Sequence, residues 1–489
     1  MPGKIKSVHD PRISLNILSK EDVQKIHTAT LDIIESVGVR FPSHKALDIL
    51  EANHAQVDRQ KMIAKIPGHI IEEALSKAPP VYTLAAIDPS LDLPLDGTYS
   101  HLGTDGCGVE ILDAFTGERR RTTKKDVQDV ARVADYLDQI AFHWVPISAQ
   151  DCPPQSRSLH ELEAIWLVSK KHLQTESIIN ENEMKTAIDM AAAIVGGRDA
   201  LRKRPILSVM QCTTSPLSHD GGSLEAGLVA AEAGLPIGYM TMASCATTGP
   251  VTLAGNLVVG NAEVISALAL MEMAYPGCPV YYAAAQTSAD LRTGAYTGGG
   301  PEDFLFGAAT NVLADFYNVP LSMGAFATGA KEPGWQSAVE NSLSAFMAVS
   351  TLSDMLLGAG LLHGSRILSY EMLLLDAEIW SILCSTFEGI VVDEENLALD
   401  VIRAVGPGGN FLAQKHTKKH MNERWLPRYM DRRPYNVWEQ KRDGAREWAL
   451  QDAQKILREY HPQPLEDQLV AELDRIIHHH EMKFKPQNG

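Results

Sequence analysis

The sequence predicts an α/β fold, a closed (β/α)8 barrel with helical extensions at both ends. From about residue 81, short apolar runs alternate with Ala-rich helical segments that are long enough to cross over a parallel sheet. The eight expected strands are 99–104, 141–147, 175–179, 206–212, 236–242, 279–284, 320–327 and 354–360. An open doubly wound sheet is the alternative. That fold usually carries a glycine-rich turn after its first strand, and the chain has neither GxGxxG nor GxxxxGKS.

The first 80 residues predict a helical region. Ser19 followed by Asp22 has the spacing of a capping box, apolar residues then recur at helical spacing, and Gly38 is a stop signal. Two further helices are expected at 44–54 and 66–79. We therefore divide the chain into an N-terminal helical region (1–80), a barrel domain (81–390) and a C-terminal helical region (391–489).

Two further predictions concern the loop after the first barrel strand and the C-terminal region. Segments 109–113 and 118–123 flank a turn at Phe115–Gly117, which predicts a hairpin after the first barrel strand. In the C-terminal region, 391–406, 438–461 and 466–485 each indicate one helix.

Composition limits the function. The formal charge of −17, from 61 acidic and 44 basic residues, argues against nucleic acid or an anionic membrane surface as partner, and is compatible with a cationic ligand. The N-terminus lacks the apolar core of a signal peptide, and no run approaches the roughly 18 apolar residues of a membrane span. The six cysteines form no CxxC pair and none clusters with histidine. We expect a soluble, cytoplasmic protein that binds no metal of its own.

A barrel places its active site on the loops that follow the strands. Asp105 follows the first strand, where it either caps a turn or faces a substrate cation. Aromatic residues near strand ends can be ordinary core, or together can cage a quaternary ammonium. The candidates are Trp144, Tyr281, Tyr282, Phe326 and Trp335, of which we assign Trp144, Tyr282, Phe326 and Trp335 to substrate binding. The other loop residues are mostly small or hydroxylic, which predicts an open mouth able to admit a large group.

Other motifs have plainer interpretations. The glycine-rich stretch 291–303 fits a tight loop better than a phosphate cradle, because it contains no lysine. Lys331 lies on a polar turn, where a Schiff-base role is unfavoured. His416 and His420 share one helix face, but no glutamate lies between them as in zinc proteases, so a solvated face is expected.

Six stretches in this order resemble the trimethylamine methyltransferase (MttB-like) superfamily over residues 15–435. They are VEILDAFTGERRRTTKKD (109–126), TSPLSHDGGSLEAGLVAAEAGLPI (214–237), ATTGPVTLAGNLVVGNAEVISALAL (246–270), SADLRTGAYTGGGPED (288–303), TGAKEPGWQSAVE (328–340) and GPGGNFL (406–412). The resemblance implies a TIM barrel and methyl transfer from a methylated amine to the Co(I) form of a corrinoid (cobalamin) carried on a separate protein. It also implies a homo-oligomer.

The resemblance bears on the substrate. Founding members of the family place pyrrolysine at a position that the motif puts near Val339, and nothing there is non-standard. Members without pyrrolysine are thought to demethylate quaternary amines such as glycine betaine, proline betaine or carnitine. We therefore expect a betaine donor; a non-catalytic betaine-binding barrel is the alternative.

Roles for residues follow from this expectation. Asp105, Gln286 and His363 are the predicted catalytic residues. Arg292 joins the aromatic candidates as a substrate-binding residue, and donors for a betaine carboxylate would come from Gln286, Thr287, Arg292 and His363. Gly298, Gly299, Gly300 and Lys331 are predicted to face the corrinoid. Two departures from the family pattern are Gly329, in TGAK, and Asp105, in GTDG.

Overall fold

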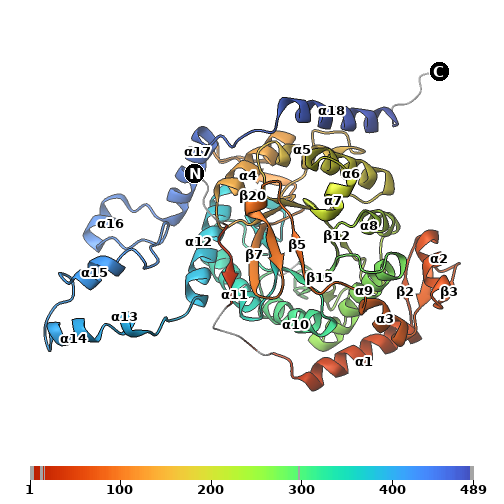
Figure 1. Cartoon of the computed structure of the whole chain (residues 1–489), viewed down its shortest axis with the longest axis horizontal. Helices are drawn as coiled ribbons and strands as arrows, with labels where there is room; N and C mark the ends of the chain where they lie inside the picture. Colours follow the sequence, from red (N-terminus) through yellow and green to blue (C-terminus); the bar gives the residue numbers. More distant parts are fainter. Residues whose placement is uncertain (1–4, 11–14, 16, 296–297, 485–489) are drawn as a thin grey trace.

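The computed structural model describes residues 5–10, 15, 17–295 and 298–484, and its centre is a closed barrel of eight parallel strands (Figure 1). In pairing order the strands are β7 (Tyr99–Thr104), β10 (Phe142–Trp144), β11 (His172–Thr175), β12 (Leu207–Cys212), β13 (Ile237–Thr241), β15 (Val280–Ala284), β17 (Leu321–Gly324) and β18 (Met355–Ala359). β18 pairs with β7 through Met355 and His101, which closes the ring. The barrel prediction is confirmed, and the open sheet is excluded.

One strand prediction is wrong. The third strand was expected at 175–179, but β11 ends at Thr175 and residues 176–179 form the loop after it. His172 made the true strand look polar. In the structure this ring is fully buried, with Nδ1 2.8 Å from the Ala85 carbonyl and Nε2 2.8 Å from Ser208 Oγ, so its polar atoms are satisfied inside the fold.

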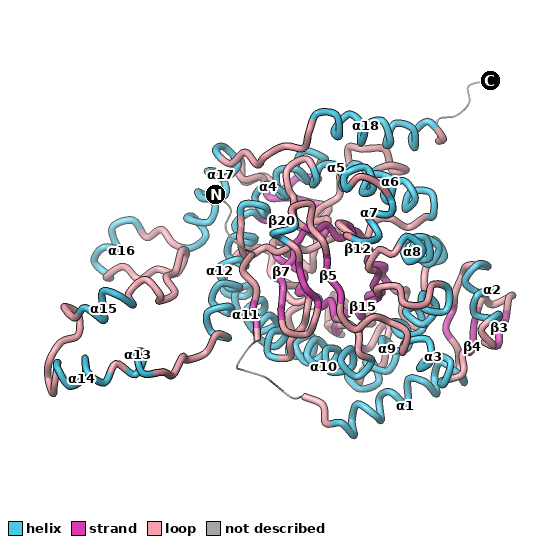
Figure 2. Tube along the Cα trace, viewed as in Figure 1, coloured by secondary structure: helices cyan, strands magenta, loops and turns pink. Residues whose placement is uncertain are grey.

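Helices surround the strands on the outside of the ring (Figure 2). They are α4 (Lys124–Tyr136), α5 (Arg157–Trp166), α6 (Glu181–Val195), α7 (Arg198–Lys203), α8 (Gly221–Ala233), α9 (Leu253–Ala274), α10 (Pro301–Tyr317), α11 (Trp335–Ser350) and α12 (Tyr370–Phe387). Among the described helices, α9 alone is long and apolar enough to cross a membrane, yet 78% of its most apolar window is buried. It packs against α1 and α3, so it is a core helix of the barrel wall.

Two separate cores follow from strand alternation, because successive side chains point to opposite faces. Tyr281 and Ala283 of β15 lie in the interior core with Trp144, whereas Tyr282 lies in the outer core between strands and helices. The interior core also holds Phe142, Met210, Met240, Met355 and Leu357.

A hairpin closes the amino-terminal end of the barrel. It consists of β5 (Tyr82–Leu84), the short 3-10 helix η1 (Pro89–Leu91) and β6 (Leu93–Leu95), and Figure 2 shows β5 across the ring of strands. Leu84, Leu93 and Leu95 belong to the interior core. The barrel is therefore filled with side chains from below.

The loops at the carboxyl end carry small sheets. The predicted hairpin is confirmed as β8 (Glu110–Leu112) and β9 (Arg119–Arg121), and it joins β19 (Leu361–Leu362) and β20 (Ile367–Ser369) in the order β19-β20-β8-β9. A second pair, β14 (Ser244–Cys245) and β16 (Thr287–Ser288), extends the loops after β13 and β15.

The N-terminal region is helical only in part. The predicted helices are present as α1 (Lys20–Ser36), α2 (His44–Ala52) and α3 (Gly68–Leu75), and Ser19 and Asp22 form the expected capping box. The region also contains a three-stranded sheet of β2 (Val39–Arg40), β4 (Ile63–Lys65) and β3 (Gln56–Asp58), while β1 (Val8–His9) pairs antiparallel with β7. Strands of two or three residues are too short for a period to show in the sequence.

The C-terminal helices are more broken than predicted. The first expected helix is divided into α13 (Glu394–Leu397) and α14 (Leu399–Val405) at Ala398, whose φ is 49°. The second is divided near Gly444 into α16 (Tyr435–Lys441) and α17 (Ala445–Glu459), and α15 (Lys415–His420) precedes them. Residues 389–442, here called the arm, extend away from the barrel in Figure 1, whereas α17 and α18 (Asp467–Met482) pack on its helices.

Candidate active site at the carboxyl end of the barrel

Asp105 lies at the mouth of the barrel, directly after β7. Its side chain is 3% exposed; Oδ1 accepts a hydrogen bond from the Gly106 amide at 2.8 Å and Oδ2 one from Ser365 Oγ at 2.5 Å. Burial raises the pKa of this carboxyl to about 7, although both hydrogen bonds oppose the shift. Asp105 is thus a buried acid that holds its proton more tightly than an exposed carboxyl does.

Glu176 is a second acid of the same kind, on the loop after β11. The exposed Cys107 donates its thiol hydrogen to Glu176 Oε1, while the buried Oε2 has no hydrogen-bond partner in the part of the chain that the structure describes. Burial, with the nearby charge of Asp105, raises the Glu176 pKa to about 7. Among the described residues, neither acid has a Lys or Arg ion-pair partner.

Aromatic side chains form the floor below these acids. A Cβ on Gly106 would lie 2.5 Å from Trp144 Cε2, so the absence of a side chain there lets the indole pack beneath the Asp105–Gly106 turn. Trp144 is 5% exposed, and its buried Nε1 has no partner. The hydroxyl of Tyr281 donates to the Val209 carbonyl at 2.7 Å, which fixes the ring deeper in the barrel.

Together these groups suit a fixed positive charge. Two carboxyls with raised pKa values lose their protons readily when a cation arrives, because an opposite charge favours their ionised form. Ring faces attract the same cation. A quaternary ammonium has no N–H to donate, so it needs negative charge and π faces rather than directed acceptors.

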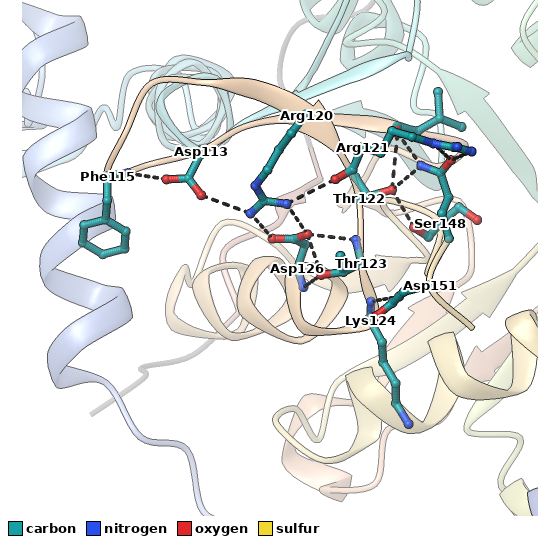
Figure 3. Close-up of polar contacts among 12 residues, drawn as sticks. Asp113, Phe115, Arg120, Arg121, Thr122, Thr123, Lys124, Asp126, Ser148 and Asp151 are labelled. Carbon is teal, nitrogen blue, oxygen red and sulfur yellow. Dashed lines mark hydrogen bonds and ion pairs between the residues drawn. The ribbon is translucent and has the colours of Figure 1, made fainter. Parts of the chain in front are cut away.

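A charged network holds the β8–β9 hairpin beside this mouth (Figure 3). The Arg120 guanidinium donates to both oxygens of Asp126, at 2.7 and 2.8 Å, and to Asp113 Oδ2 at 3.0 Å. Asp126 also closes the capping box of α4 with Thr123. Thr122 Oγ1 donates to the Ser148 carbonyl at 2.6 Å, so the hairpin is fixed to the loop that follows β10.

The predicted catalytic residues do not form one group. Gln286 is buried, and its side chain is turned toward α9. Its amide nitrogen donates hydrogen bonds to the Asn256 carbonyl at 2.8 Å and to Asn256 Oδ1 at 2.6 Å. The exposed His363 has φ 58°, and its backbone amide donates to the Ala330 carbonyl at 2.8 Å. It lies two residues before Ser365, whose hydroxyl donates to Asp105, whereas Gln286 is hydrogen-bonded to Asn256 of α9.

Of the predicted substrate-binding residues, the structure places only Trp144 inside the barrel. Tyr282 of β15 and Phe326, two residues after the end of β17, are both fully buried in the outer core. Trp335 is 82% exposed at the start of α11, and the exposed Arg292 pairs with Asp290 at 2.7 Å. These four side chains do not gather around Asp105.

The predicted corrinoid-facing residues lie on two joined loops. Asp303 Oδ2 accepts from the amides of Gly299 and Gly300 at 2.7 and 3.1 Å, and the Gly298 carbonyl accepts from the Gly329 amide at 3.1 Å. Lys331 is exposed, with Nζ 2.5 Å from the Gly329 carbonyl. Tyr296 and Thr297, in the same glycine-rich stretch, lie outside the described residues.

Val339 is 37% exposed in the second turn of α11, so its side chain does not lie in the packed interior of the barrel. All 489 residues of the sequence are standard amino acids, so no pyrrolysine stands at this position or at any other.

Glu176 and Cys107 were not among the residues predicted for the site, whereas Tyr281 was one of the aromatic candidates. Glu176 was expected inside the third strand, which was predicted too far along the chain. Because β11 ends at Thr175, Glu176 is the first residue of the loop after it, just as Asp105 is the first residue after β7. Tyr281 and Tyr282 are adjacent in a continuously apolar strand, which gives no sign of which ring faces inward.

Comparisons with known proteins agree with this architecture. A family model described as "Trimethylamine methyltransferase (MTTB)" matches residues 2–484. The chain is 33% identical to trimethylamine methyltransferase MttB of Desulfitobacterium hafniense over 469 residues, covering 95% of this chain and 94% of that protein. It is 31% identical to a glycine betaine methyltransferase from another strain of that organism, covering 94% and 96%.

A solved structure shows the same fold. The monomethylamine methyltransferase (MtmB) of Methanosarcina barkeri matches with a TM-score of 0.51 and 10% identity, over 92% of this chain and 96% of that chain. Fold and family together define a methyltransferase built on a TIM barrel. The chain belongs to the trimethylamine methyltransferase family.

Proposed function

We propose that this enzyme moves a methyl group from a quaternary amine, glycine betaine or a related betaine, to the Co(I) corrinoid of a separate protein. The observation that carries the proposal is the pair of acids at the mouth. Asp105 and Glu176 have raised pKa values and, within the described chain, no cationic side chain as ion-pair partner. An incoming cation would supply the missing partner.

The demethylation of a quaternary amine fits a site that contains two carboxyls with raised pKa values. When the N–CH3 bond breaks, the electron pair stays on nitrogen and a neutral tertiary amine leaves, so no acid is needed to activate the leaving group. The positive charge on nitrogen disappears during the step, so a site that bound it too strongly would stabilise the substrate more than the transition state. Carboxyls that regain protons near pH 7 limit that cost.

The chain's own residues then have three tasks. Asp105 and Glu176 bind the cation, Trp144 and Tyr281 shape the floor that orients one methyl group outward, and the packed interior keeps water away. His363, beside the Asp105 loop, is the predicted residue placed to meet a betaine carboxylate. Gln286 would need to release Asn256 to do the same.

The mouth is compatible with a corrinoid. Cys107 and Met242, which follow β7 and β13, are exposed, and Gly298–Gly300 leave the facing loop without side chains. A corrinoid bound there supplies a nucleophilic cobalt that takes the methyl group. Gly298–Gly300 and Lys331 are the residues we assign to its contact. The proposal includes a cytoplasmic location, no metal held by this chain, and no nucleic-acid or membrane partner.

The two named relatives frame the choice of donor, since one is a trimethylamine and the other a glycine betaine methyltransferase. A tertiary amine is the harder substrate, because its leaving group must be activated. Pyrrolysine is thought to do this in the family's founding members, and this sequence contains none. We therefore favour the quaternary donor.

The test is a reaction between the purified chain, a cognate corrinoid protein reduced to Co(I), and a panel of amines. Glycine betaine, proline betaine or carnitine should methylate the corrinoid, seen as a change in its absorption, and trimethylamine should not. The proposal would be rejected if trimethylamine were the only amine that methylates the corrinoid, or if none of the amines did so. Calorimetric betaine binding without corrinoid methylation would identify a binding protein instead.

A further inference from the structure

The arm has no hydrophobic core of its own. None of α13, α14, α15 and α16 contains a buried residue, and large apolar side chains stand in solvent. The most exposed include Val392, Leu412 and Leu426, at 72%, 82% and 69%. Exposed apolar groups at this density are typical of an interaction surface.

The arm is nevertheless anchored at its base. The Tyr429 amide donates to Glu378 Oε1 on α12 at 3.1 Å, and its hydroxyl to Asp452 on α17 at 3.0 Å. Between its limbs, Lys419 pairs with Glu395. The arm is thus held in place on one side and uncovered on the others.

A second uncovered apolar surface lies on the barrel. Val339, Leu343 and Phe346 follow one another at helical spacing on the outer face of α11 and are 37–47% exposed. The extensions cover other barrel helices: α1 and α3 pack on α9, α17 on α4 and α12, and α18 on α6. The helices that pack extensively against α11 are its barrel neighbours α10 and α12.

The two surfaces have complementary charge. Residues 415–442 of the arm contain nine Lys and Arg against three Asp and Glu, within a chain of formal charge −17. Helices α10 and α11 contain four acidic residues, Glu302, Asp303, Asp315 and Glu340, and no Lys or Arg. The basic segment 415–442 of the arm and the helices α10 and α11 therefore carry net charges of opposite sign, which favours their association.

We propose that the arm packs against α11 of a second copy of this chain, and receives that copy's arm in return. Within one molecule the arm points away from the barrel (Figure 1), so the two surfaces cannot cover each other in the same chain. The arm starts at the end of α12, next to α11, so a two-fold axis there brings each arm over the other copy's helix. The inference does not depend on the proposed substrate.

The contact would also reach the mouth. Glu340 of α11 accepts hydrogen bonds from Thr328 Oγ1 and from the Gly329 amide at 3.0 Å, and a Cβ on Gly299 would lie 2.5 Å from its Cβ. Covering α11 thus supports the loops that we assign to corrinoid contact.

Sedimentation of the full-length chain tests the pairing. The wild type should sediment at an even multiple of the 53.4 kDa chain mass. Leu343→Glu/Phe346→Glu and, separately, Leu412→Asp/Leu426→Asp should each halve that mass or reduce it to one chain, with unchanged far-UV circular dichroism. Val81→Glu, at an exposed apolar residue near the opposite end of the barrel, is the matched control and should keep the wild-type mass.

A disulfide cross-link tests whether the arm contacts α11 of the second copy. Chains carrying Leu343→Cys and Leu412→Cys are mixed and oxidised; a covalent heterodimer should form, and neither chain alone should exceed the wild-type background from exposed Cys107. A monomeric wild type overturns the proposal, as does an oligomer that survives both double variants. If only the arm variant dissociates the oligomer and no cross-link forms, α11 is not the surface that the arm contacts.

Discussion

Two pairs of acidic residues near the same end of the barrel behave in opposite ways. Asp113 and Asp126 on the rim share the Arg120 guanidinium, and although burial favours the neutral acid, the hydrogen bonds to these carboxylates hold both pKa values below the usual range. Asp105 and Glu176 at the mouth have no such partner, and burial raises both pKa values to about 7. A paired carboxylate stabilises the fold; a buried, unpaired one is available to a ligand.

The largest expected effect comes from neutralising the mouth. Glu176→Gln should weaken binding of a betaine by roughly 100-fold, because removing one partner of a buried charge pair costs about 2–5 kcal/mol. Isothermal titration calorimetry without corrinoid measures this directly. Glu118→Gln, at an exposed rim residue, makes the same charge change and should leave affinity unaltered. Equal losses in both variants would contradict a specific cation site.

The same comparison predicts a dependence on pH. A cation binds only the ionised carboxyls, so affinity should be constant well above the free-state pKa of about 7 and fall as the pH drops below it. Each carboxyl that must lose a proton contributes about a tenfold loss per pH unit. Titration of the wild type between pH 5.5 and 8.5 measures the slope. A flat profile would show that the acids are not what the cation meets.

On the rim, Arg120→Lys should lower stability and spare binding. A lysine is a single-point donor and cannot bridge Asp113 and Asp126 as the guanidinium does, so we expect a loss of about 2 kcal/mol in the free energy of unfolding. Denaturant unfolding gives the stability, and calorimetry with a betaine gives the affinity. If affinity falls as far as in Glu176→Gln, the division between structural and ligand-binding acids is wrong.

The smallest effect is expected from Asp105→Asn on stability, and its sign is informative. The folded-state pKa is raised above the unfolded value of 3.8, so the folded protein retains a proton that the unfolded chain loses, and this group's contribution to stability declines as the pH rises from about 4 to 7. At pH 8 the asparagine variant avoids a buried charge and should be more stable than the wild type. This advantage should shrink as the pH falls to 5, where the folded wild type keeps the proton on Asp105. Differential scanning calorimetry at both pH values decides; destabilisation at pH 8 would mean that a cationic group stabilises the carboxylate in the folded protein.

The sequence predicted the barrel well because strand and helix periods persist over long segments. It predicted Asp105 and Trp144 for the site, since both follow or end a correctly placed strand. It missed Glu176 because the polar start of β11 shifted the strand by three residues, which moved a loop residue into the sheet. An error of three residues in a strand boundary does not change the predicted fold, but it changes which residues are expected in the active-site loop.

Side-chain direction was the other obstacle. Tyr282 was preferred although its neighbour Tyr281 is the ring inside the barrel, because a strand buried on both faces has no alternation to read. Gln286 follows β15 as a site residue should, but Asn256 of α9, thirty positions earlier, takes both of its amide hydrogens. Such long-range partners are visible only once the helices are packed.

The hairpin β5–β6 fills the amino-terminal end of the barrel with Leu84, Leu93 and Leu95. Under the proposed function, the amine and the corrinoid carrier would both approach from the carboxyl end. The amine would then bind before the carrier docks, and the demethylated amine would leave after the carrier has dissociated.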